Sequence, residues 1–368
     1  MKCVEIRVTA TNLEMKKAVA TATKSMQHIQ GLTVSVTTDD GVIGFGYVDV
    51  FPRAGETPES VRHAIEVVFK PILLGRDLEE LPRLSAEMKH HMTGNARAKS
   101  AIEGALYDAL ARSLRMPLYM LLGGRYRDDI SLIQTIGAGD PDEMADDAKD
   151  ATRRGFGLKL KITGDPQLDL LRVARVRDAI GGGVFMKVDA NESYDAKGAI
   201  RLAKQMADHG VDTFEQPVPR RHLDALWEVT RNSPINIEAD QSVRDVEDAY
   251  ALISNRMVDS ISTGIRRIGS LQEVRLIAEM CASAGMRCVI SSTAGSMVAD
   301  AMAVHLVAST PSIEPIAELA GFDAILGDPF TGLRIEEGLL PVPTGDGIGV
   351  NPIAGHSILV ANGGVEGP

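Results

Sequence analysis

The chain has 368 residues and a formal net charge of -11, and 44% of its residues are hydrophobic while 24% are charged. This balance is typical of a globular protein, and a length above the roughly 250 residues of a minimal β/α barrel leaves room for a second, smaller domain. An acidic chain without a basic stripe excludes a nucleic-acid-binding surface, and the lack of any apolar stretch of about 18 residues excludes a membrane-spanning helix.

The cysteines indicate a reducing compartment. Cys3, Cys281 and Cys288 are the three cysteines of the chain, and they form no paired framework. The chain does not open with a charged segment followed by an apolar run, as a secretory signal would. We therefore expect a cytoplasmic protein.

The first 49 residues predict β-structure. Cys3 to Val8 and Leu32 to Thr37 alternate apolar and polar side chains, and Asp39-Asp40-Gly41 forms a turn into a further strand at residues 42–47. Residues 16–30, between the first two strands, show no firm periodicity. We expect them to form a loop.

Residues 57–116 predict helices. Thr57 is a candidate N-cap, and Met116-Pro117 ends the last helix. A helical apolar stripe at positions i, i+3, i+4, i+7 and i+8 is formed by Ile102, Ala105, Leu106, Ala109 and Leu110.

From residue 130 onward, short apolar runs alternate with helical segments, which predicts a β/α barrel of seven or eight parallel strands. The eighth strand is the least distinct and is expected near Ile316 to Leu319. The other expected strands are Ile130 to Ile136, Gly157 to Ile162, Val184 to Asp189, Thr213 to Glu215, Ile235 to Ala239, Ser260 to Gly264 and Arg287 to Ser291.

A charged residue closes each of four successive strands. Lys161, Asp189, Glu215 and Asp240 follow one another at intervals of 28, 26 and 25 residues, the length of one strand, one helix and two loops. In β/α barrels the catalytic groups lie at the C-terminal ends of the strands. Three acids converging there are hard oxygen ligands, which suit Mg²⁺ or Mn²⁺ better than Zn²⁺.

Two lysines precede the acids by one strand. Lys159 and Lys161 are two residues apart, so on an extended chain both face the same side. Crowding two ammonium groups lowers the pKa of at least one, which makes a lysine a usable base near neutral pH. A base opposite a divalent cation can take a proton from the carbon next to a carboxylate.

Two other polar residues have structural explanations. Glu238 lies two positions before Asp240 on the same strand face, so an ion pair with Lys187 or Lys159 and a catalytic role both remain open. His305 is expected to pack on its helix and not to act in catalysis.

The order of these motifs resembles the enolase superfamily, in particular its mandelate racemase/muconate lactonizing enzyme family, and the resemblance covers nearly the whole chain. It implies an N-terminal α+β capping domain at residues 1–125 and a TIM-type barrel with the catalytic site at residues 126–320. It also implies that residues 321–368 return to the capping domain and end in a tail.

The resemblance also implies roles for the motif residues. Asp189, Glu215 and Asp240 would bind Mg²⁺, or alternatively Mn²⁺, while Lys161 and Lys159 would be the catalytic lysines. The combination of a base and Mg²⁺ is characteristic of that superfamily. The expected partner is a small-molecule carboxylate, with neither nucleic acid nor membrane involved, and a homo-oligomer is the expected assembly.

Candidate substrate contacts are His28, Asn191, Gln216 and Thr293. In the family the segment corresponding to residues 16–30 reaches over the barrel mouth, although an ordinary surface loop is the alternative for His28. Asn191 is either a substrate contact or a helix cap, and Gln216 is a candidate orienting amide.

The chain departs from the family at its second base. Gly264 stands where the family usually has a lysine at the end of the sixth strand, and Ser291-Ser292-Thr293 stands where mandelate racemases have a histidine. Gln241 replaces the usual glutamate after the last metal aspartate. The chain therefore keeps a base on one face of the substrate only.

Racemisation needs a proton-transferring group on each face, whereas β-elimination needs one base. We therefore expect α-proton abstraction to a metal-stabilised enediolate, followed by dehydration of a small 3-hydroxy carboxylate or hydroxy amino acid, as in the family's cis-3-hydroxyproline dehydratases. The alternatives are a racemase, epimerase or cycloisomerase with a non-lysine second acid such as Thr293 or Ser262, and a catalytically impaired metal-binding paralogue.

Overall fold

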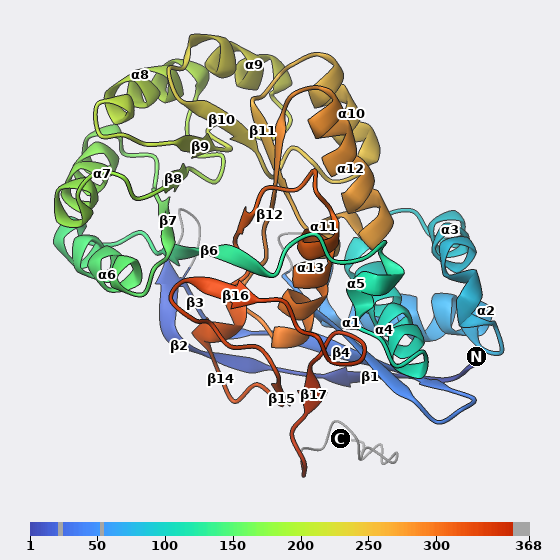
Figure 1. The fold of residues 1–368 in the computed structure, drawn as a ribbon. Helices are drawn as coiled ribbons and strands as arrows, with labels where there is room; N and C mark the ends of the chain where they lie inside the picture. The colour runs from blue at the N-terminus through green and yellow to red at the C-terminus, as the bar shows by residue number, and fades with distance from the viewer. Residues whose placement is uncertain (21–24, 52–54, 356–368) are drawn as a thin grey trace, which may run out of the picture.

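The computed structural model describes the chain except for residues 21–24, 52–54 and 356–368. It contains a β/α barrel and, beside it, an α+β cap built from the N-terminal segment and joined by part of the C-terminal segment (Figure 1). Residues 356–368 of the expected tail lie outside the described residues.

Eight parallel strands form the barrel: the first seven pair in chain order and the eighth pairs with the first, which confirms the predicted barrel. Beyond the ladder, Glu318 N donates to Ile290 O at 2.9 Å and Ser292 N donates to Glu318 O at 2.9 Å, so the last strands also meet. The strands are β6 (Asp129–Ile136), β7 (Gly157–Lys161), β8 (Met186–Asp189), β9 (Thr213–Glu215), β10 (Asn236–Ala239), β11 (Ser260–Thr263), β12 (Arg287–Ile290) and β13 (Ile316–Ala317).

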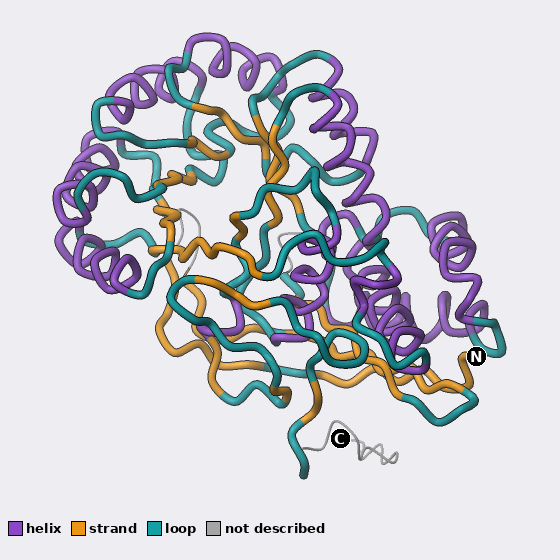
Figure 2. Tube along the Cα trace, viewed as in Figure 1, coloured by secondary structure: helices purple, strands orange, loops and turns teal. Residues whose placement is uncertain are grey.

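Helices surround these strands, as the purple helices outside the orange strands in Figure 2 show. They are α6 (Pro141–Arg153), α7 (Pro166–Ile180), α8 (Ala196–Ala207), α9 (Leu223–Asn232), α10 (Val246–Ser254), α12 (Leu271–Ser283) and α13 (Met297–Ser309), with the short α11 (Ile265–Ile268) after β11. Several begin at an aspartate whose carboxylate accepts from backbone N–H groups of the first turn, which satisfies donors that the helix leaves unpaired. These N-caps are Asp140, Asp165, Asp195 and Asp245.

The cap contains an antiparallel sheet of β1 (Cys3–Ala10), β4 (Gly31–Thr38) and β5 (Ile43–Asp49), with α4 (Ala96–Ser113) packed against it. A Cβ at Gly44 would lie 2.2 Å from Ala109 N, and one at Gly46 would lie 1.9 Å from Ala101 O. The two glycines of β5 therefore allow α4 to approach the sheet closely. The remaining cap helices are α1 (Pro58–His63), η2 (Ala64–Phe69), α2 (Lys70–Leu73), η3 (Leu78–Glu80), α3 (Leu81–His91) and α5 (Leu118–Leu121).

The predicted loop at residues 16–30 is wrong, because β2 (Leu13–Ala20) and β3 (Ser25–Ile29) pair as antiparallel strands there. Leu13 and Met15 are buried while Glu14 and Lys16 are exposed, so a strand alternation is present. The alternating stretch is short and includes few apolar residues, so it does not stand out in the sequence. The pairing of β14 (Ile325–Leu326) with β2 adds a partner that is distant in sequence.

The C-terminal segment contacts both parts of the molecule. Besides β14, it contains β15 (Phe330–Thr331), which pairs with β17 (Asn351–Pro352), and β16 (Leu339–Pro341), which pairs with β6 of the barrel. The 3-10 turn η4 (Gly321–Ala324) precedes these strands. The division at residues 125 and 320 stays a prediction.

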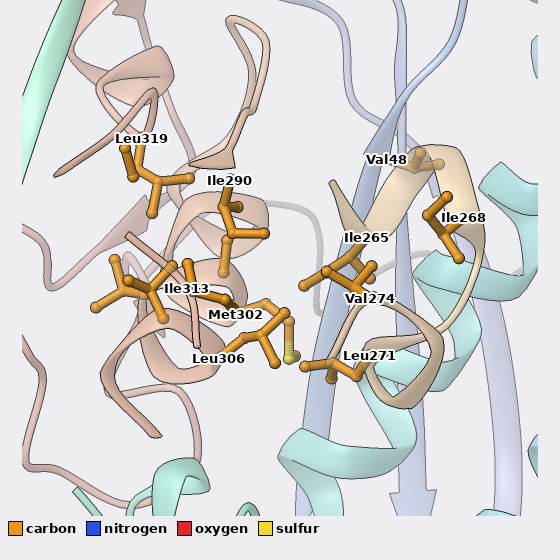
Figure 3. Packing of buried hydrophobic residues seen from close by; sticks show 14 of the residues in the cluster. Val48, Ile265, Ile268, Leu271, Val274, Ile290, Met302, Leu306, Ile313 and Leu319 are labelled. Carbon is orange, nitrogen blue, oxygen red and sulfur yellow. The ribbon is translucent and has the colours of Figure 1, made fainter. Parts of the chain in front are cut away.

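The hydrophobic core is continuous between barrel and cap, and α13 lies where they meet. In Figure 3, Met302 and Leu306 of α13 lie between Ile290 and Ile313 on one side and Leu271 on the other. His305 on the same helix is fully buried, and its Nδ1 accepts from Tyr119 N at 3.2 Å. His305 therefore packs in the core, as the sequence predicts.

Candidate active site

Charged residues from neighbouring strands occupy adjacent positions at one end of the barrel. Lys161 on β7 is paired with Asp189 on β8, and Asp189 is paired with Glu215 on β9. Glu215 is in turn paired with Glu238 on β10. The strand register alone therefore brings one lysine and three buried carboxylates into one row.

Lys159 lies at the centre of the carboxylates. Its Nζ is 2.8 Å from Glu215 Oε1, 2.9 Å from Glu318 Oε2 and 3.1 Å from Asp189 Oδ2. Burial alone lowers the pKa of Lys159, but these carboxylates outweigh it and raise that pKa well above the usual range. The lowering expected from crowded lysines does not occur at Lys159, because anions are its closest neighbours.

Lys161 is held toward the cavity by its neighbours. Its Nζ contacts Asp189 Oδ2 and lies 3.1 Å from Asn191 Oδ1, and its side chain is only 13% exposed. Asn191 also donates from Nδ2 to Asp189 Oδ2 at 3.1 Å. Burial alone raises the pKa of Asp189, but Lys161 and Lys159 hold that pKa below its usual range.

Asp240 follows β10 and is fixed by two side chains. Its Oδ1 lies 2.5 Å from Arg267 Nη1, and its backbone N donates to Gln216 Oε1 at 3.0 Å. Gln216 Oε1 also accepts from Ser242 N, and Gln216 Nε2 donates to Val218 O and Ser242 Oγ. The buried Gln216 amide thus orients the loop that carries Asp240.

The oxygen donors fit a hard divalent cation. Glu215 Oε2 and Asp240 Oδ1 are buried and accept no hydrogen bond, although Lys187 Nζ lies 3.3 Å from the first and Arg267 Nη1 lies 2.5 Å from the second. Carboxylate oxygens of this kind are the ligands that Mg²⁺ prefers.

Within the described residues, a second set of three carboxylates is closely grouped: ligand atoms of Glu215, Glu238 and Glu318 lie within 4.8 Å of one another. The fully buried Lys187 already neutralises this set, because its Nζ lies 2.5 Å from Glu238 Oε1 and 2.9 Å from Glu318 Oε1. Asp189 and Asp240 line the central cavity together with Glu318, whereas Glu215 and Glu238 do not. Asp189 and Asp240 therefore face the side from which an ion would enter.

Glu318 is a site residue that the sequence reasoning missed. It directly follows β13 and bridges Lys159 and Lys187. Burial alone raises its pKa, but the two ammonium groups lower it. The sequence feature that could have identified Glu318 was an acidic residue at the end of the eighth expected strand. That strand was the least distinct in the sequence.

A cavity of about 1840 Å³ opens above these groups. Lys161, Asn191 and Thr293 are among the residues that line it. His28 is not, since it lies exposed on β3 opposite Glu14. The hairpin instead lines the cavity from β2, through Met15, Lys16 and Lys17.

Across the barrel from Lys161, the position of Gly264 cannot hold a side chain in this backbone. Gly264 follows β11, which is four strands from β7 in the order of the sheet. A Cβ there would lie 2.3 Å from the carbonyl oxygen of Ser291. Close in sequence to these two positions, Ser262 Oγ and Thr293 Oγ1 are buried hydroxyl oxygens without a hydrogen-bond partner. Of the two residues, Thr293 lines the cavity, together with Arg266 and Arg267.

Two family domains match the chain. Residues 3–123 match the N-terminal domain of the mandelate racemase / muconate lactonizing enzyme family, and residues 143–354 match the enolase C-terminal domain-like family. Together they span most of the chain.

Individual relatives agree with this match. The chain is 30% identical to muconate cycloisomerase 1 of Rhodococcus opacus, covering 95% of this chain and 96% of that protein. It is 31% identical to the L-Ala-D/L-Glu epimerase of Bacillus subtilis, covering 85% and 87%. The structure of the Enterococcus faecalis dipeptide epimerase with Mg and the dipeptide L-Leu-L-Tyr superimposes with a TM-score of 0.91 at 29% identity, covering 95% and 99%. The chain therefore belongs to the mandelate racemase/muconate lactonizing enzyme family of the enolase superfamily.

Proposed function

We propose that this enzyme transfers a proton at the carbon next to a carboxylate, with Lys161 as the base and with Asp189, Glu215 and Asp240 as ligands of Mg²⁺. The relatives named above are a cycloisomerase and epimerases, which supports an isomerase more than the dehydratase expected from the sequence. The substrate is a small carboxylate, and dipeptides and muconate-like diacids are the classes to examine first.

The single observation that carries the proposal is the placement of Lys161. Its amine contacts Asp189 and Asn191, its side chain lines the cavity, and Gly264 lies across the barrel. One base supports a reaction with a single proton transfer on one face, such as cycloisomerisation, in which the α-carbon gains a proton as the ring closes and loses it as the ring opens. A two-base epimerisation requires a further donor on the second wall.

Other residues have supporting roles. The raised pKa of Lys159 keeps it protonated, so it acts as a fixed positive charge beside Glu215 and Asp189. Arg267 and Gln216 hold Asp240 in place. When bound, Mg²⁺ supplies a Lewis acid that withdraws charge from a substrate carboxylate.

Dehydration of a 3-hydroxy carboxylate is the second candidate. It also needs only one base, and the Thr293 hydroxyl, which has no hydrogen-bond partner and belongs to a residue that lines the cavity, favours a wall that receives a leaving hydroxyl group. Release of water from a 3-hydroxy acid would distinguish this reaction from isomerisation.

The test is α-proton exchange in D₂O with Mg²⁺, followed by ¹H NMR for dipeptides, muconates and 3-hydroxy acids. We expect Lys161→Ala to lower exchange by about 10²-fold or more, because a positioned acid–base group contributes at least that much. The matched control is Lys197→Ala, an exposed lysine on α8. Exchange that is equal in wild type and Lys161→Ala would refute Lys161 as the base.

A further inference from the structure

We propose that Arg266 binds a second carboxylate of the substrate, so that the enzyme acts on a small acid with an anionic group at its far end. The inference rests on the proposed function, in which the first carboxylate of the substrate faces the metal ligands and Lys161. Arg266 then receives the other end of the molecule on the side of the barrel that contains Gly264.

Arg266 lies where the barrel meets the cap. It is the second residue of α11, the short helix that follows Gly264. Ile265 and Ile268 anchor this helix in the hydrophobic core. The Arg266 side chain lines the central cavity and is 16% exposed, and the next residue, Arg267, contacts the proposed metal ligand Asp240. Arg266 is therefore a fixed cation that faces the same cavity as the metal ligands.

One edge of the Arg266 guanidinium has no partner among the described residues. Nη1 donates to Asp49 Oδ2 at 3.3 Å, and Nε is buried without a hydrogen-bond partner. Nη1 lies on the side of the guanidinium away from the Nε–H, so the edge formed by Nε and Nη2 stays open. Two parallel N–H groups of this kind bind a carboxylate in a bidentate manner.

The neighbouring carboxylates pair with other cations. Arg97 on α4 lies 3.1 Å from Glu56 and donates from Nε to Asp49 O at 3.0 Å. Arg267 Nη1 lies 2.5 Å from Asp240 Oδ1. Among the described carboxylates, Asp49 contacts Arg266 through a single oxygen. An acceptor for the open edge therefore has to come from the cavity.

Water is the alternative partner of the open edge. A second cavity of about 40 Å³ shares Arg266, Ser291 and Ser292 with the central cavity. That volume is enough for a water molecule and too small for a substrate. A water molecule there would satisfy Nε without any effect on substrate choice, whereas a substrate carboxylate would make affinity depend on the charge of the ligand.

A distal carboxylate narrows the proposed substrate classes. Muconate-like diacids carry two carboxylates, and a dipeptide carries a second one only when one of its side chains is acidic. An apolar group at the far end would leave the guanidinium edge without an acceptor, which weakens binding. The open edge of Arg266 therefore favours diacids over monoacids of the same length.

The test is calorimetric binding to the Mg²⁺-loaded full-length enzyme. The probes are succinate, glutarate and adipate, each compared with its monoamide, which has nearly the same shape and one charge fewer. We expect the wild type to bind at least one diacid about tenfold or more tightly than its monoamide, because hydrogen bonds between charged groups are the stronger ones. A wild type without such a preference would overturn the inference.

Variants assign the preference to Arg266. Arg266→Met should bring the two affinities within about twofold of each other, and Arg266→Lys should keep part of the preference, since it retains the charge without the fork. The matched control is Arg244→Met, which removes a cavity-lining arginine that is 59% exposed and lies 3.5 Å from Asp248. It should keep the full preference. An unchanged preference in Arg266→Met would show that substrate does not occupy the guanidinium edge.

Asp49→Asn separates substrate binding from a purely structural contact. This variant removes the charge that pairs with Arg266 and leaves the guanidinium in place. A substrate-binding Arg266 keeps its preference for diacids in Asp49→Asn. If Arg266→Met acts only by breaking the contact between cap and barrel, Asp49→Asn should abolish the preference equally, and that result would overturn the inference.

These outcomes do not depend on Lys161, because binding is measured without turnover. Exchange of the α-proton that is unchanged in Lys161→Ala overturns the proposed function, while the comparison of diacids with monoamides still decides the role of Arg266. A preference for diacids that survives in Arg266→Met overturns this inference and leaves Lys161 as the base.

Discussion

At the residue scale, one glycine decides which acid–base groups the cavity contains. The carbonyl of Ser291 occupies the space that a Cβ at Gly264 would need. The paired strands β11 and β12 therefore leave no room for a lysine at position 264. A lysine restored by substitution alone would force these two strands apart. The chemistry of this wall must therefore come from other residues that line the cavity, which include Ser292, Thr293 and Arg267.

Gly264→Ala should destabilise the fold even though it adds one methyl group. Its Cβ would lie 2.3 Å from a backbone oxygen, and overpacking of this kind costs about 1 to 3 kcal/mol. The free energy of unfolding from urea titration is the measurement. Gly182→Ala is the control, since nothing lies within 4 Å of its added Cβ. Equal stability of both variants would contradict the close contact.

At the element scale, aspartates at strand ends and aspartates at helix N-termini have different functions. Asp195 and Asp245 cap α8 and α10 by accepting from backbone N–H groups. Asp189 ends β8, Asp240 directly follows β10, and both line the cavity. Their positions at the ends of apolar runs, not their residue type, separate the two roles in the sequence.

Metal binding should therefore depend on Asp189 and Asp240 and not on Glu238. A ligand present at about 100 times its Kd stabilises the folded state by roughly 2.7 kcal/mol, so Mg²⁺ should raise the Tm of the wild type. Asp189→Asn or Asp240→Asn should abolish this rise, whereas Glu238→Gln should retain it because Glu238 is paired with Lys187. Differential scanning calorimetry with Mg²⁺ or EDTA measures it, and loss of the rise in Glu238→Gln alone would assign the metal to the deeper carboxylates.

At the scale of the whole molecule, buried ionisable groups make stability depend on pH in opposing directions. Asp189 and Glu318 have lowered pKa values, so they stabilise the fold above their unfolded pKa and this stability is lost as pH falls. Asp300 has a raised pKa, so below about pH 4 its contribution is fully present, and it is lost as pH rises toward 7. The pH profile of the wild type is a sum of such terms.

Asp300→Asn should isolate one of these terms. Its free energy of unfolding should improve relative to wild type as pH rises from about 4 to about 7, by up to a few kcal/mol, because only the wild type must then lose a proton from a buried carboxyl. Urea titrations at several pH values measure the difference. A difference that stays constant across this range would show that Asp300 does not titrate there.

The barrel and the residues at its strand ends could be predicted from the chain alone. Strand and helix periodicities are local, and the charged residues at the ends of β7, β8, β9 and β10 could be read directly from their spacing. It did not predict the β2–β3 hairpin, whose short strands depend on pairing with each other and with β14.

Which charges neutralise one another depends on how the strands and helices pack. Lys159 was expected to lose proton affinity beside Lys161, but Glu215, Glu318 and Asp189 from three other strands surround it and have the opposite effect. Asp300 attracted no attention in the sequence because it lies within a helix, and its burial depends on the packing of α13. A pKa is set by solvent exclusion and by charges within a few ångströms, and neither is determined by residues adjacent in the chain.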